Sequence, residues 1–75
     1  MNRLFRILFP DGSRLDAVEG TPTFEAAVSR SFGSAYSYVW TDPHMGNWVV
    51  FGTSPRNAFE RLPKSVQQHL VFIPF

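Results

Sequence analysis

Cysteine is absent from this 75-residue chain. Without cysteine no disulfide can cross-link the fold, and no thiolate can bind zinc or attack a substrate. A chain of this size buries only about 60–65% of the surface that its unfolded form exposes. Stability must therefore come from apolar packing. The composition supports this, since 44% of the residues are hydrophobic and the chain contains eight phenylalanines.

An excess of charge of either sign is also missing, since seven basic residues face six acidic ones and leave a net charge of +1. A near-neutral chain lacks the broad positive field expected of a general binder of phosphate backbones. Six of the seven basic residues are arginine. Arginine favours bidentate contacts in partly desolvated interfaces, although a GC-rich genome would produce the same bias.

Long hydrophobic runs are absent as well. The longest one, Leu70 to Phe75, is far shorter than the roughly 20 residues that a membrane-spanning helix needs. The apolar stretch near the start is interrupted at Pro10, too early for a signal peptide. With no repeat and no linker, we expect a single α+β domain over residues 1–75, in the cytoplasm and without a membrane partner.

The pattern of apolar residues predicts strands separated by clear turn signals. Pro10-Asp11-Gly12-Ser13 combines a residue with fixed φ, a side chain that can bond its own backbone, and a glycine. Asp42 to Gly46 forms the second hairpin loop. The expected strands cover residues 3–9, 13–19, 35–41, 47–52 and 71–75.

Two helical segments are expected between these strands. The first begins at Thr21-Pro22-Thr23 and ends at Gly33. Its apolar stripe consists of Phe24, Ala27, Val28 and Phe32. The second begins at Ser54-Pro55, and Pro63 divides it because an internal proline removes a backbone donor. We therefore expect two short helices at 55–61 and 63–69.

This order, ββαββαβ, predicts a two-layer α+β sandwich in which helices cover one face of a mostly antiparallel, five-stranded sheet. The second to fifth strands, taken with the helices, also match the βαββαβ order of ferredoxin-like folds.

Asp42 and His44 form the one cluster that suggests chemistry. A metal site needs three or four ligands, and a catalytic triad needs a nucleophile beside an oriented base. The other histidine, His69, falls on a different predicted element. Asp-Pro commonly opens a turn, and no phosphate-binding glycine loop or carboxylate pair is present. The sequence predicts no catalytic residue, no metal and no cofactor.

An aromatic stripe on two neighbouring strands is the stronger signal. Tyr36, Tyr38, Trp40 and Trp48 share one face and form either the core under the helices or a docking surface. If helices cover one face only, the other keeps large apolar side chains, which soluble proteins rarely leave unused. Basic residues near the Pro63 break form either a solvated surface or the rim of an interface. The candidate partner-binding residues are Tyr36, Tyr38, Trp40, Trp48, Arg56, Arg61 and Lys64.

These features favour a non-enzymatic protein that docks on a protein complex of the host cell. Small phage and mobile-element inhibitors of host defence, anti-CRISPR proteins included, commonly share this design. The alternative is a single-stranded nucleic-acid binder that stacks bases on sheet aromatics. Against it, NWVVFGT lacks the basic-glycine-aromatic motif of RNA-recognition modules. A homodimer would use the same spare surface.

Overall fold

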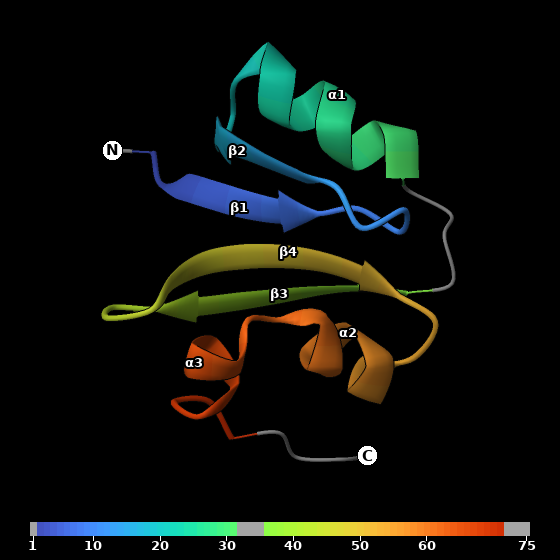
Figure 1. Cartoon of the computed structure of the whole chain (residues 1–75). Coiled ribbons are helices and arrows are strands. Elements are labelled where there is room, and N and C mark those ends of the chain that lie inside the picture. Colours follow the sequence, from blue (N-terminus) through green and yellow to red (C-terminus); the bar gives the residue numbers. More distant parts are fainter. Residues whose placement is uncertain (1, 32–35, 72–75) are drawn as a thin grey trace.

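The computed structural model describes residues 2–31 and 36–71, apart from the side chain of Tyr36. It forms an α+β domain with a four-stranded mixed sheet and three helices (Figure 1). Val71 belongs to no strand, and the rest of the fifth predicted strand lies outside the described residues. The elements are β1 (Leu4–Leu8), β2 (Arg14–Val18), α1 (Pro22–Ser31), β3 (Tyr36–Asp42), β4 (Gly46–Gly52), α2 (Pro55–Arg61) and α3 (Lys64–Gln67).

The sheet has the strand order β2-β1-β4-β3. Its two outer pairs are antiparallel, as predicted, but the central pair, β1 and β4, is parallel. Helix α1 stands between β2 and β3 in the chain, and these strands form the two opposite edges of the sheet. The described strands therefore do not form the ferredoxin-like arrangement.

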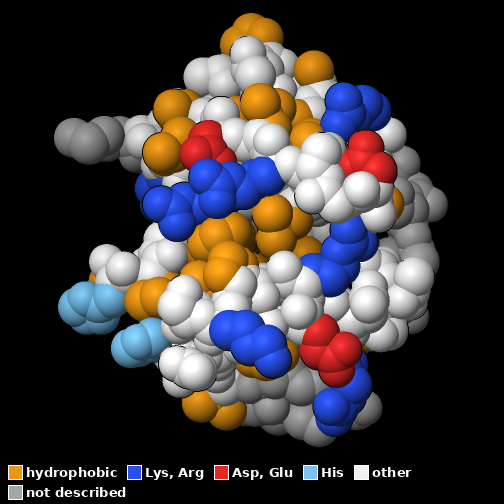
Figure 2. All heavy atoms as spheres, in the orientation of Figure 1, with side chains coloured by type: hydrophobic (Ala, Val, Ile, Leu, Met, Phe, Trp, Pro, Cys, Tyr) orange, Lys and Arg blue, Asp and Glu red, His pale blue; other side chains and the backbone are white. Residues whose placement is uncertain are grey.

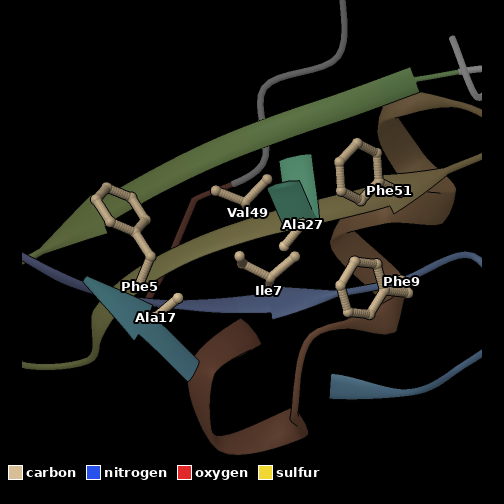
Figure 3. Packing of buried hydrophobic residues seen from close by; sticks show 7 residues of the cluster. All are labelled: Phe5, Ile7, Phe9, Ala17, Ala27, Val49 and Phe51. Atoms are coloured by element: carbon tan, nitrogen blue, oxygen red, sulfur yellow. The ribbon is translucent and has the colours of Figure 1, made fainter. Parts of the chain in front are cut away.

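Helices cover both faces of the sheet, so the prediction of a single covered face is wrong. On the face that we call the α1 face, Ala27 of α1 joins a buried cluster of strand residues (Figure 3). Phe24 of the same helix lies 5.6 Å from the ring of Phe5, centroid to centroid. The strand residues of this cluster are Phe5, Ile7, Phe9, Ala17, Val49 and Phe51.

The opposite face, which we call the α2–α3 face, holds a second buried cluster. Trp48 and Val50 of β4 pack there with three residues from the α2–α3 segment: Ala58, Leu62 and Val66. Strand β4 is thus apolar on both sides, which is typical of a strand at the centre of a sheet with parallel pairing. Such a strand requires cover on both faces.

The turn and helix boundaries follow the predicted local chemistry. The Asp11 carboxylate accepts hydrogen bonds from the backbone N–H (2.9 Å) and the hydroxyl (2.6 Å) of Ser13. Ser54 caps α2 by accepting from the N–H of Asn57 at 3.0 Å. Leu62, before Pro63, is extended with ψ of 151°, because a residue preceding proline avoids the helical region. Two short helices form, as expected.

Candidate partner-binding surfaces

Trp48 lies in the core and is 1% exposed. Its indole N–H donates to the backbone oxygen of Met45 at 3.0 Å, which satisfies its one polar atom. The guanidinium of Arg6, on the neighbouring strand β1, lies over the ring at 5.2 Å from the centre of the indole. Of the two alternatives for this ring, the structure shows the core.

Tyr38 and Trp40 are half-buried on the α2–α3 face of β3. Their rings stack at 5.5 Å, and Trp40 meets Phe59 of α2 edge-on at 6.3 Å. Tyr36 begins the same strand, but its side chain lies outside the described part. The two described rings are therefore packed under α2 on one side while remaining accessible at the edge of the sheet.

Arg61 has a structural role that the sequence does not reveal. Its guanidinium donates to the backbone oxygen of Phe51 at 2.8 Å, of Phe9 at 2.6 Å and of Pro10 at 3.0 Å. Phe51 belongs to β4, and the other two residues directly follow β1. One side chain thus ties α2 to the carboxyl ends of the two parallel strands.

The other two basic candidates are on the surface. Arg56 is exposed in the first turn of α2, and Lys64 is exposed at the start of α3. Both are more exposed than Arg61, which is half-buried and bonded to the backbone of β4 and of the segment after β1.

Asp42 organises the β3–β4 turn. One of its carboxylate oxygens accepts from the N–H groups of both His44 and Met45 at 2.8 Å. These bonds, from Met45 first and then from His44, hold the pKa of Asp42 below its usual value. The Asp42 carboxylate is therefore used by the backbone of its own loop.

We expect Asp42→Asn to make the stability of the fold less dependent on pH in the acidic range. Because the folded-state pKa is lowered, the carboxylate stabilises the fold fully above the unfolded-state pKa of about 4 and loses this effect as pH falls through the folded-state value. Asparagine can keep the turn bonds but does not titrate. The melting temperature should therefore fall less between pH 7 and low pH in the variant than in the wild type, and identical acid profiles would contradict this role.

One half of the α2–α3 face is open, because α2 packs on β4 and β3. Leu8 at the end of β1 still packs against the second cluster, but the rest of this face of β1 and β2 is exposed. Leu4 and Val18 lie opposite each other in the register and are 52% and 38% exposed. Arg6 and Asp16 form the next pair on this face. Arg14 lies on the same side, with its guanidinium 3.3 Å from the Asp16 carboxylate. We call these five residues the open half-face.

A groove of about 380 Å³ runs beside the open half-face. Figure 2 shows this side of the molecule, with a band of Lys and Arg side chains over β1 next to hydrophobic side chains over β4. The groove is lined by Arg6, Arg14, Pro43, His44, Met45, Gly46, Trp48, Pro63, Ser65 and Val66. The sequence left Trp48 as a residue of either the core or a docking surface, and Arg6 and Arg14 are not among the candidates predicted from it.

No protein-family model matches the chain, and neither the curated proteins nor the solved structures contain a significant match. Among residues 2–31 and 36–71, no group of three or more His, Cys, Asp or Glu side chains is arranged to hold a metal ion. No helix in the same ranges has the length and apolar character needed to cross a membrane.

Proposed function

We propose that this protein acts without catalysis, by docking its open half-face on a protein partner in a host-cell complex. The observation that carries the proposal is the exposed pair Leu4 and Val18 beside the Arg6–Trp48 stack. An apolar centre bordered by arginine is the usual composition of a protein interface. A small inhibitor of a host defence complex, the class suggested by the sequence, would act in this way by blocking a surface of its target.

The charges indicate the kind of partner. The open half-face carries Arg6 and Arg14 against the single carboxylate of Asp16, and this carboxylate lies next to Arg14. The exposed His44 borders the groove from the β3–β4 turn. The surface therefore suits an acidic protein patch with an apolar centre, and its association should slow as salt screens the charges.

Nucleic-acid binding receives less support from this geometry. Recognition of single strands on a sheet relies on open aromatic faces for base stacking. Here Trp48 is buried beneath Arg6, and Trp40 packs against Phe59 of α2. Stacking of a base on Trp48 would require Arg6 to move away, and stacking on the side of Trp40 that meets Phe59 would require α2 to move away from β3.

The test is affinity capture of the partner from host lysate, followed by titration of the purified partner with variants. Leu4→Ser combined with Val18→Ser should weaken binding by about tenfold or more, since both side chains are central to the apolar patch. Val71→Ser is the matched control, because Val71 is 84% exposed and outside the sheet. Circular dichroism and melting temperature would show that each variant remains folded.

Two outcomes would contradict the proposal. A partner that binds the double variant as tightly as the wild type would place the docking surface elsewhere on the molecule. Salt-sensitive binding of single-stranded DNA or RNA by the purified protein, weakened by Arg6→Ser, would favour the nucleic-acid alternative.

A further inference from the structure

Strand β3 leaves one of its edges without a partner among the described residues. It forms one end of the sheet, and within residues 2–31 and 36–71 only β4 pairs with it. The outer side of an edge strand presents backbone N–H and C=O groups that can pair with another strand. The natural occupant of such an edge is therefore a second extended backbone.

The features that usually protect an edge strand are missing from β3. Its seven residues, Tyr36 to Asp42, include no proline, lysine or arginine. The single charge, on Asp42, is at the end of the strand and bonds the turn. The register with β4 runs one to one along all seven residues, so no bulge turns the edge away. By contrast, β2 at the other edge is five residues long and carries Arg14 and Asp16.

The side chains of β3 offer apolar surface on both faces of the sheet. Val39 on the α1 face is 59% exposed. Tyr38 and Trp40 on the opposite face are half-buried and stacked on each other. A strand added along this edge would cover parts of all three side chains.

We propose that β3 pairs in an antiparallel manner with β3 of a second copy, about a two-fold axis perpendicular to the sheet that passes midway between the two Val39 residues. This axis joins the two sheets into one of eight strands and keeps each face continuous across the junction. The inference goes beyond the proposed function, because the docking surface on β1 and β2 lies at the far side of each sheet and stays open in the dimer.

The residues of β3 favour a second copy over an unrelated strand. The segment is chemically symmetric about Val39, with an aromatic residue on each side, Tyr38 and Trp40, followed by a hydroxyl residue, Ser37 and Thr41. In the dimer Val39 faces its copy, Tyr38 faces Trp40 and Ser37 faces Thr41, while Tyr36 faces Asp42 at each end of the ladder. The aromatic pair and the hydroxyl pair are favourable cross-strand pairs. This centre also gives the longest ladder, since any other axis leaves residues at one end unpaired.

The experiment exploits the position of Val39 beside the axis, opposite its own copy. Light scattering of the full chain should give twice the monomer mass of 8.6 kDa. Val39→Lys and Val39→Glu each place like charges opposite each other, and each should raise the dissociation constant by about tenfold or more. An equimolar mixture of the two variants should restore the dimer, because the lysine of one chain then faces the glutamate of the other.

Leu4→Lys is the matched control, since Leu4 is similarly exposed but lies on β1. This variant should remain dimeric, and the melting temperatures should show that every variant is folded. The proposal is overturned by a monomeric wild type, by a dimer that survives Val39→Lys, or by a mixture that stays monomeric. Slow hydrogen exchange at the outward amides of β3 in a monomer would also overturn it. Partner capture through the open half-face can succeed in each of these cases, so the two proposals fail separately.

Discussion

Replacing Gly52 with alanine should destabilise the protein by about 3 kcal/mol. A Cβ at this position would lie 2.8 Å from the backbone nitrogen and 2.9 Å from the Cα of Ala58. It would also lie 2.8 Å from the side-chain oxygen of Asn57, which accepts the N–H of Thr53. Two of these three atoms belong to the backbone of α2, so a side-chain rotation cannot relieve the overlap.

The helix would have to move away from the end of β4. That movement would open the packing of Ala58, which is completely buried, against the strand. For a domain of this size the loss corresponds to a melting temperature lower by about 12–24 °C. Urea denaturation followed by tryptophan fluorescence would give the free energy of unfolding directly.

Gly12→Ala separates steric overlap from backbone strain. Gly12 has a φ of +92°, and nothing lies within 4 Å of a Cβ built on it. Alanine there should cost only about 1 kcal/mol, the usual cost of placing a side chain in the left-handed region. If both variants lost the same stability, the close contact between β4 and α2 would not be the reason for glycine at position 52.

The turns and helix boundaries could be predicted because their causes are local. Asp11 and Asp42 each accept a hydrogen bond from the backbone two residues further on. Ser54 caps α2 by accepting from the backbone N–H three residues further on. Pro63 ends α2 through its effect on Leu62. In each case the residues that determine the structure are neighbours in the sequence, so the type of residue is sufficient evidence.

The pairing of the strands and the placement of the helices could not be predicted in the same way. Alternation correctly places Trp48 and Trp40 on one face of the sheet. That face is covered because α2 returns to pack on it, and the alternation of residues does not give the side to which a helix returns. The four consecutive apolar residues from Trp48 to Phe51 did carry the signal, because a strand that is apolar on both sides needs two layers of cover.

The same limit applies to the candidate partner-binding residues. Trp48 is large and amphipathic, which fits both a core and an interface. Its packing against the α2–α3 segment, with Arg6 over its ring, decides for the core. Arg61 was grouped with Arg56 and Lys64 because the three are close in sequence. Its bonds run to Phe9, 52 residues away, and to Pro10, 51 residues away. No local pattern reports contacts of that range.

Arg61→Ala should therefore have the second large effect, a loss of about 3 kcal/mol in the free energy of unfolding. The substitution removes three charge-assisted hydrogen bonds and leaves the backbone oxygens of Phe9 and Phe51 without their side-chain donor. Both oxygens lie near buried phenylalanine rings, since Phe9 and Phe51 are 4% and 1% exposed and stack at 6.4 Å. The bonds to both oxygens are part-buried, so water replaces the lost donor only incompletely.

Arg61→Lys should recover only part of this loss, because a single ammonium lacks the planar fork that reaches both strands at once. Lys64→Ala is the control, since Lys64 is exposed and its removal should change stability by about 0.5 kcal/mol or less. Urea denaturation of the three variants measures these differences. If Arg61→Ala were as mild as Lys64→Ala, the guanidinium would not hold α2 to the sheet. Arg61 would then return to the set of residues available to a partner.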